Sequence, residues 1–152
     1  MAKKHVKSAV SEQQELQEKF IQLQVMKQQA QSYLEEKQKV DSALTELTMT
    51  LEAMKKLKGT KTNNEIWPTL GSGTFIKGEI TDASNIMVGV GAGIVVKKTL
   101  ADATEVMEKR VADMRKVDDE LMGELTKIVE TIQSLEPEVE KLAEKLQKEG
   151  NL

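Results

Sequence analysis

Apolar residues in the first third of the chain return at alternating steps of three and four within a mostly polar segment. The repeat passes through Leu23/Met26, Ala30/Tyr33, Lys37/Val40, Leu44/Leu47 and Leu51/Met54, and Leu16 and Phe20 extend it less regularly. A three-four alternation is the heptad pattern of a coiled-coil helix. No glycine or proline occurs between Ser11 and Lys58. The pattern therefore predicts one unbroken helix over residues 11–58.

Both ends of this predicted helix carry local signals. Ser11 with Gln14 fits a capping box, in which the two side chains accept hydrogen bonds from the first amide groups of a helix. Lys55, Lys56 and Lys58 crowd the last turn, where cations favour the negative end of the helix dipole. Gly59 then stands where a helix commonly ends in a left-handed residue.

A second heptad pattern fills the last third of the chain and predicts a helix over residues 99–149. Thr99 with Asp102 three residues later marks its start. Gly123 and Pro137 interrupt it, and a proline inside a helix kinks it, so we expect the last turns to diverge or flex. The apolar positions are Met107, Val111, Met114, Val117, Leu121, Leu125, Ile128, Ile132, Leu135, Val139, Leu142 and Leu146.

The two predicted helices match in length, at ~72 Å and ~76 Å for a rise of ~1.5 Å per residue. Between them, residues 59–64 form a turn-rich link, and four short β-type runs follow at 65–70, 74–80, 85–90 and 94–98. Glycine-rich turns within each pair predict two β-hairpins. The fold class is therefore mainly α with a small β insert: a long antiparallel two-helix coiled coil joined by two hairpins, with both chain termini at the same end.

The predicted hairpins carry more apolar surface than they can bury alone. Four short strands need a partner surface for stability, and the helix seams are committed to each other. Pro68 cannot donate to a strand ladder, so its strand should lie at an edge or carry a bulge. We therefore predict an oligomer interface formed by Ile66, Trp67, Leu70, Phe75, Ile76, Ile80, Ile86, Val88, Val90, Ile94 and Val96.

Composition and charge narrow the function class. The chain of 152 residues is 31% charged and only 3% aromatic, which suits a narrow buried seam better than a wide globular core. The net charge is −3; residues 1–58 are slightly basic, whereas residues 101–152 hold fourteen acidic against eight basic side chains. This difference favours pairing of the two helices within one chain. It also argues against a nucleic-acid binder, which is usually basic.

Candidate chemistry is sparse. There is no cysteine, and the single histidine, His5, lies in the basic leader. The glycines of Gly89-x-Gly91-x-Gly93 have the wrong spacing for a dinucleotide loop, and a strand follows them. The acidic run from Asp118 to Glu124 and the lysines from Lys55 to Lys61 are typical of solvated helix faces and helix ends. We therefore expect no enzyme activity, no cofactor and no metal. Without a membrane-spanning or signal-peptide pattern, a cytoplasmic protein is expected.

The chain resembles α-class prefoldin subunits, most closely those of archaea. The resemblance rests on the order helix, two hairpins, helix, and on the hairpin segment GSGTFIKGEITDASNIMVGVGAGIVVKKTLADA. The run FIKGEI, the turn VGVGAG, the strand VVKK and the late proline in LEPEVEKL carry it. It implies one prefoldin-like domain over residues 1–152: a basic leader (1–10), helix one (11–58), linker and hairpins (59–98) and helix two (99–149).

The resemblance also implies an assembly and an activity. Such proteins form a hexamer of two α-class and four β-class subunits, with the hairpins joined in a double β-barrel body and six coiled-coil arms. The family acts as a holdase that needs no ATP: it captures unfolded client proteins at the arm tips and passes them to a group II chaperonin. No nucleic acid and no membrane takes part.

From the antiparallel geometry we predict that apolar side chains at the free end of the coiled coil, unmatched or fraying apart, bind clients. These are Val6, Val10, Leu16 and Phe20 from helix one, and Val139, Leu142, Leu146 and Leu152 from helix two. Packing in the helix seam is the competing explanation for each of them. Two other functions stay open: a self-assembling prefoldin-like homo-oligomer or filament, and a coiled-coil tether in transcription or chromatin assembly.

Overall fold

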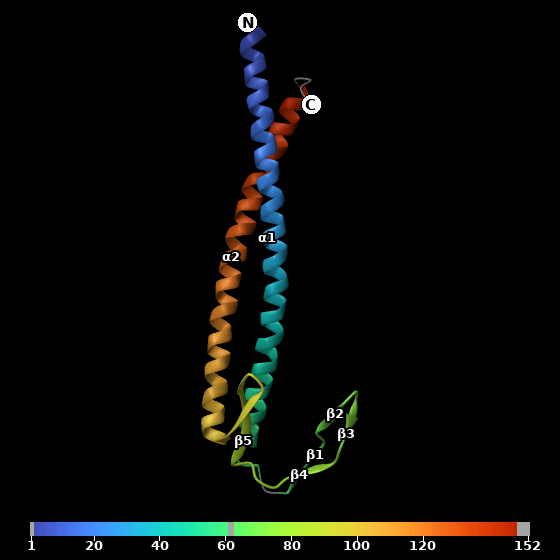
Figure 1. Cartoon of the computed structure of the whole chain (residues 1–152), viewed down its shortest axis with the longest axis vertical. Coiled ribbons are helices and arrows are strands. Elements are labelled where there is room, and N and C mark those ends of the chain that lie inside the picture. The colour runs from blue at the N-terminus through green and yellow to red at the C-terminus, as the bar shows by residue number, and fades with distance from the viewer. Residues whose placement is uncertain (1, 61–62, 149–152) are drawn as a thin grey trace. The chain divides into compact units, whose positions relative to one another are not determined.

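The structure, a computed structural model, describes residues 2–60 and 63–148, with side chains for 11–60 and 63–148. Along the sequence, two long helices flank the strands, as predicted, but the strands number six where the sequence pattern predicts four (Figure 1). In chain order the elements are α1 (Ala2–Leu57), β1 (Asn64–Ile66), β2 (Thr69–Gly71), β3 (Thr74–Phe75), β4 (Gly78–Ile80), β5 (Asn85–Gly91), β6 (Ile94–Thr99) and α2 (Leu100–Lys148).

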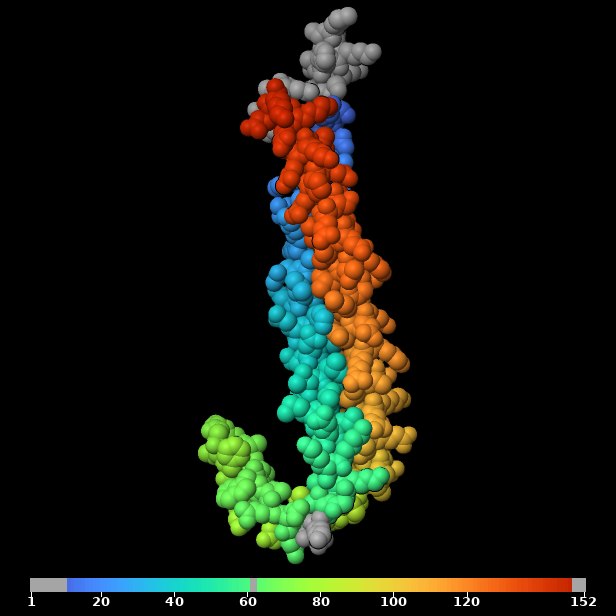
Figure 2. Space-filling view, turned by 180° about the vertical axis from the view of Figure 1, so that it is seen from behind, coloured from blue at the N-terminus to red at the C-terminus, as the bar shows by residue number. Residues whose placement is uncertain are grey.

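The contacts divide the chain into two compact units. The helical unit comprises residues 1–40 and 117–152, and the hairpin unit comprises residues 41–116. In each unit α1 and α2 run antiparallel and touch side by side (Figure 2). The strands form three two-stranded antiparallel pairs, and the described part of the single chain contains no closed barrel.

Helix α1 differs from its prediction at its start and agrees with it at its end. It begins at Ala2, so Ser11 lies within the helix and does not cap it. Residues 2–10 contain no glycine or proline that would stop the helix earlier. At the other end Gly59 has φ +95°, the left-handed conformation expected after a helix. The Thr60 amide donates to the carbonyl of Leu57 at 3.0 Å.

The buried stripe of α1 confirms the heptad prediction. Buried and half-buried positions alternate at three and four residues without interruption: Leu16, Lys19, Leu23, Met26, Ala30, Tyr33, Lys37, Val40, Leu44, Leu47, Leu51 and Met54. On α2 the same alternation holds, but Asp118 takes the place predicted for Val117. Val117 is exposed, and Asp118 is half-buried beside Lys37, with Lys37 Nζ to Asp118 Oδ1 at 2.8 Å. An ion pair of two facing helices thus occupies one layer of the seam.

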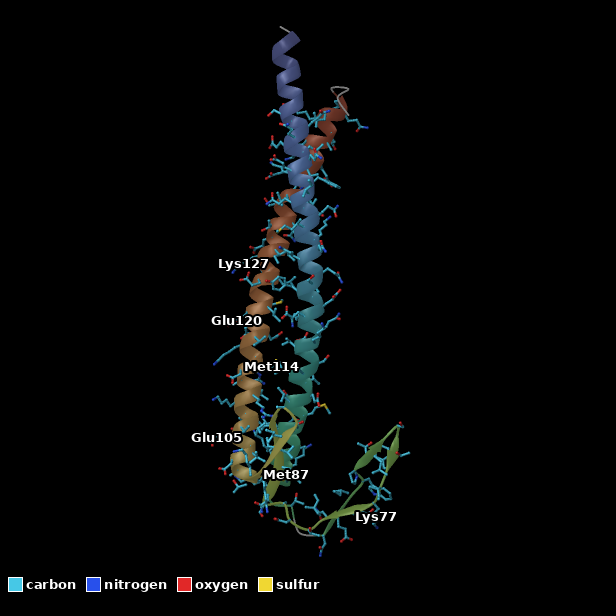
Figure 3. All side chains as sticks on the ribbon, in the orientation of Figure 1. Lys77, Met87, Glu105, Met114, Glu120 and Lys127 are labelled. Carbon is cyan, nitrogen blue, oxygen red and sulfur yellow. The ribbon has the colours of Figure 1, made fainter. Side chains whose placement is uncertain are left out.

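Pro137 lies inside α2 without ending it, and the helix continues to Lys148. Of the divergence or flexing expected for the last turns, divergence is wrong, because Val139 and Leu146 beyond the proline are buried. Pro137 itself is exposed, so its ring points away from the seam. The side of α2 away from the seam also carries Glu120 and Lys127 (Figure 3).

The first predicted hairpin is split by Pro68. Strand β1 pairs with β4 through Glu65 and Glu79, whereas the shorter strands β2 and β3 pair separately nearer the turn. Proline lacks an amide hydrogen, so the ladder is interrupted there. The Ile76 amide still donates to the Pro68 carbonyl at 3.0 Å. A register shift between Thr69 and Gly71 adds the irregularity that the sequence predicts for this strand.

The second hairpin, β5 with β6, is regular from Asn85 to Gly89 and packs on the helices of its unit. Val88 is 3% exposed and belongs to a core cluster of the hairpin unit. The other buried members are Leu51, Met54, Ala103, Met107 and Val111, with Ile86 packed against them. Both helices therefore cover one face of this hairpin, which the sequence reasoning had left for another subunit.

A hydrogen-bonded turn joins the two hairpins and leads to a prediction. The Asp82 carboxylate accepts three hydrogen bonds. The donors are the Ser84 hydroxyl, the side-chain amide of Asn85 at 3.0 Å and the backbone amide of Ser84 at 2.8 Å. These bonds lower the pKa of Asp82 from 3.8 to about 2.

Because the folded pKa lies below the ordinary value, the turn is stabilised above pH ~4 and loses this stabilisation as pH falls toward 2. A carboxyl titration followed by NMR should place the Asp82 midpoint near 2. Ser84→Ala should raise it toward the ordinary value. A wild-type midpoint near 4 would contradict the turn geometry.

Candidate functional site

An apolar groove of about 450 Å³ lies between α1 and α2 in the helical unit. The groove is lined by Leu16 and Phe20 from α1 and by Val139, Ala143 and Leu146 from α2, with Gln13, Gln17 and Glu140 at its polar rim. Phe20 stands one residue outside the heptad seam and is 50% exposed. It therefore offers aromatic surface to the groove without being needed to join the helices.

The predicted client-binding residues meet in this groove to different degrees. Four of them line it together: Leu16, Phe20, Val139 and Leu146. Leu142 does not line it; it is half-buried and precedes the lining residue Ala143 in the sequence. Val139 and Leu146 are buried, with Leu146 at 0% exposure, so they form a floor and do not fray apart. The side chains of Val6 and Val10, and all of Leu152, lie outside the described residues.

Ion pairs between α1 and α2 join the two walls of the groove. Lys145 Nζ lies 2.8 Å from Glu12 Oε1, and Lys19 Nζ lies 2.7 Å from Glu138 Oε2. The Glu138 carboxylate, followed by Glu15, raises the pKa of Lys19, and Lys19 in turn lowers the pKa of Glu138. Both groups stay charged across the neutral range, so the pairing is insensitive to moderate pH change and sensitive to salt.

Sequence reasoning missed two exposed apolar side chains of α1 that follow Phe20 in the sequence and do not line the groove. Ile21 is 55% exposed and Val25 is 43% exposed. Both lie off the heptad alternation that passes through Lys19, Leu23 and Met26. An apolar residue that breaks the heptad pattern was therefore the available signal, because such a residue faces away from the partner helix.

The first hairpin exposes most of the residues predicted for an oligomer interface. The exposed members are Ile66, Trp67, Leu70, Phe75 and Ile76, whereas Ile80 is half-buried. The Trp67 indole donates to Glu65 at 3.0 Å, and Lys77 pairs with the same carboxylate at 2.7 Å (Figure 3). These bonds fix the polar edge of the hairpin and leave its apolar side chains open.

Of the residues predicted for the interface on the second hairpin, some are exposed and others pack against the chain's own helices. Val90, Ile94 and Val96 are exposed, as predicted for an interface. Val88 is buried against its own helices and Ile86 is half-buried there, so we leave both out of the surface that remains open to another subunit. Met87 (Figure 3) and Val95 lie on the opposite face and are exposed, although the sequence reasoning passed over them.

The other charged clusters have structural partners. Lys55 pairs with Glu108 at 3.0 Å, which supports a structural role at the helix end, and Lys61 lies outside the described residues. Asp118 is committed to Lys37 in the seam. Within residues 2–60 and 63–148, no group of acidic, histidine or cysteine side chains is arranged to hold a metal ion. None of the helices in that part of the chain is long and apolar enough to cross a membrane.

The chain is a two-helix coiled coil with paired hairpins, and both the helices and the hairpins expose apolar side chains. This combination is typical of coiled-coil proteins that assemble with other chains. The family model for the prefoldin subunit matches residues 26–145. The chain belongs to the prefoldin family, a family of non-enzymatic chaperones.

Among its curated relatives are archaeal α subunits, which the chain matches over most of their length. It is 31% identical over 134 residues to the prefoldin subunit alpha of Methanococcus aeolicus, covering 88% of this chain and 89% of that protein. It is 36% identical over 98 residues to the prefoldin subunit alpha 1 of Thermococcus kodakarensis, covering 64% and 67%.

Two solved structures share the fold. A filamentous prefoldin from Methanocaldococcus jannaschii superposes with a TM-score of 0.63 at 17% identity, covering 74% of this chain and 93% of that one. The prefoldin beta subunit from Thermococcus strain KS-1 superposes with a TM-score of 0.55 at 19% identity, covering 84% and 90%. The predicted order of helix, hairpins and helix is confirmed by these similarities.

Proposed function

We propose that this chain is the α-class subunit of a holdase that binds unfolded proteins without ATP and delivers them to a group II chaperonin in the cytoplasm. The observation that carries the proposal is the groove of Leu16, Phe20, Val139, Ala143 and Leu146, an open apolar surface at the end of a two-helix arm. Open apolar surface on an otherwise polar helix pair is typical of a site for apolar protein segments. Membership of the prefoldin family supports the same function.

The small size of the groove fits a holding function. At ~1.5–3 kcal/mol for each large apolar side chain that it covers, one groove of this size binds a client segment only weakly. Several arms joined in one assembly raise the effective concentration of the second and later contacts, so binding becomes tight while each contact still exchanges quickly. A client is thus held against aggregation and can still be released.

We place the assembly at the hairpins and propose two copies of this chain with four β-class subunits. The exposed apolar residues of both hairpins support this, because two-stranded sheets are barely stable until further strands or another surface cover them. In this arrangement the open strands join those of neighbouring subunits in a shared barrel. The similarity in fold to a prefoldin beta subunit is compatible with such mixing.

A self-assembling homo-oligomer or filament is the second candidate. The observation in its favour is that the strands Ile94–Thr99 and Asn64–Ile66 each pair with only one other strand in the described part of the chain. One of the proteins of similar fold is a filamentous prefoldin. Native mass spectrometry separates the candidates: a defined hexamer after addition of a β-class subunit supports the first, and open-ended growth of this chain alone supports the second.

The holdase function is tested by light scattering of an aggregating client protein in the absence of nucleotide. Substoichiometric assembly should suppress the scattering, and a group II chaperonin with ATP should then recover folded client. As a control, the isolated β-class subunit is assayed at the same concentration. Unchanged client aggregation at an excess of the assembly would contradict the proposal.

A further inference from the structure

Along one flank of the helical unit, residues of α1 face residues of α2 at a fixed register. Lys27 Nζ lies 2.6 Å from Glu136 Oε1 across the two helices. One heptad earlier on α1 and one heptad later on α2, Phe20 and Ala143 line the groove together. A step of seven residues along α1 is thus matched by a step of seven in the opposite direction along α2, as expected for an antiparallel coiled coil.

The next step of seven residues brings two further apolar side chains together on the same flank. It leads to Leu34 on α1 and to Val129 on α2. Leu34 is 45% exposed and Val129 is 38% exposed. Each directly follows a seam residue in the sequence, so it lies beside the seam and is not needed to join the helices. We call these two residues the flank patch.

The flank therefore alternates between apolar and charged pairs. The groove, the Lys27–Glu136 ion pair and the flank patch follow one another at intervals of one heptad, which places the groove and the flank patch ~21 Å apart at a rise of ~1.5 Å per residue. At the corresponding heptad positions on the opposite flank, all side chains are polar: Gln22, Gln29 and Glu36 on α1, and Glu124, Thr131 and Glu138 on α2. Over this stretch the apolar surface beside the seam is concentrated on one flank.

We propose that this flank binds an amphipathic α-helical segment of a client protein as a third helix. One apolar side chain of that segment enters the groove at Phe20, and a second one, two heptads along, covers the flank patch. A polar side chain midway between them meets the Lys27–Glu136 ion pair. The inference rests on the proposed holdase function and adds to it a class of client segment and a second contact.

The geometry favours a helix over an extended segment as the occupant. A third helix that lies along the flank has the same seven-residue repeat as α1 and α2, so its side chains meet the groove, the ion pair and the flank patch in turn. Its backbone groups are bonded within the helix, whereas residues 20–34 and 129–143 are helical and offer no strand edge to an extended backbone. The side chains of Lys27 and Glu136 are 48% and 44% exposed, so both charges are accessible to a polar side chain of the client.

Methyl NMR of the full-length chain, in the assembly that it forms, tests the proposal with a helical probe peptide. The peptide has about 25 residues, mostly alanine, glutamate and lysine, with two leucines two heptads apart and a glutamine midway between them. The methyl signals of Leu34 and Val129 should shift together with those of Leu16 and Val139, with one common dissociation constant. Shifts confined to the groove residues would overturn the flank patch as part of the site.

Two altered peptides distinguish a helical occupant from an extended one. Moving one leucine by two residues puts the leucines on opposite faces of the peptide helix and should weaken binding about tenfold, which corresponds to the loss of one buried apolar side chain. Replacing the two residues beside the central glutamine with proline breaks the helix, keeps the leucine spacing and should weaken binding at least as much. A proline peptide that binds as tightly as the original would show that extended segments are bound and would overturn the proposal.

A paired substitution in the protein tests the same contact from the other side. Leu34→Ser combined with Val129→Ser should weaken peptide binding about tenfold or more, while the coiled coil stays folded because both residues lie beside the seam. Val117→Ser is the matched control, because Val117 is an exposed residue of α2 in the same unit, one heptad before Glu124 on the opposite flank. Equal peptide affinity of the double variant and the control would overturn the proposal.

The suppression of client aggregation is measured separately, so that this inference and the proposed function can fail independently. An assembly that suppresses aggregation but does not bind the helical peptide overturns this inference alone. An assembly that does not suppress aggregation overturns the proposed function.

Discussion

Replacing Phe20 and Ile21 together with serine is expected to remove most of the ability of the assembled protein to suppress client aggregation. Both side chains are at least half exposed and lie outside the heptad seam, so the cost to folding should stay within about 0.5 kcal/mol. Each large apolar side chain covered by a client contributes ~1.5–3 kcal/mol. The loss per arm is therefore tenfold or more, and contacts across several arms multiply it.

The measurement is the amount of assembly needed to halve light scattering from a denatured client. Met49→Ser is the matched control, because Met49 is an exposed apolar residue of the same helix that belongs to the hairpin unit, whereas Phe20 lines the groove and Ile21 follows it in the helical unit. Unfolding temperature and the mass of the assembly should be unchanged in both variants. Full protection by the Phe20/Ile21 variant would show that clients bind elsewhere.

Replacing Lys37 and Asp118 together with leucine is expected to stabilise the coiled coil by about 1–2 kcal/mol. The two side chains are 22% and 24% exposed and meet at 2.8 Å inside an otherwise apolar seam. Desolvation offsets most of the attraction in such a pair, so a well-packed apolar layer is often the more stable arrangement. Either single leucine variant removes one charge from the pair and should be less stable than the double variant.

Thermal unfolding of the wild type, both single variants and the double variant gives a double-mutant cycle, with an expected coupling of about 1–3 kcal/mol. A coupling near zero would mean that the pair contributes nothing to the seam. We expect the ion pair to fix the register of the two helices and not to add stability. Any shifted alignment of the helices would separate Lys37 from Asp118 and leave a charged side chain unpaired in the seam.

The helices could be predicted from the sequence because a heptad repeat is a local signal. Each seam position of α1 is set by its spacing alone, even where the residue is Lys37. The prediction failed at Val117 because the apolar residue was chosen in place of the residue at the correct heptad spacing. The strict alternation of four and three runs from Met114 to Asp118 and on to Leu121. The lysine at the facing seam position was the signal that an acid belonged in this layer.

The sequence was sufficient to predict that the hairpins form, but not which of their faces is buried by the helices. Glycines at the turns and Pro68 gave the strands and their interruption. Burial of Val88 depends on how the hairpin folds back on Leu51 and Met107, residues far away in the sequence. A period of two identifies which residues share a face, but not which face is covered. The groove depends in the same way on Phe20 and Ala143 meeting across two helices.

The placement of the two rarest aromatic side chains gives this protein a built-in optical assay. Its single tryptophan, Trp67, is 58% exposed on the first hairpin, and its single tyrosine, Tyr33, is half-buried in the helical seam. Indole emission should shift to the blue when a neighbouring subunit covers the hairpin, whereas the tyrosine signal should follow separation of the helices. Subunit joining and arm opening can thus be followed in real time, at separate wavelengths, in the unlabelled wild-type chain.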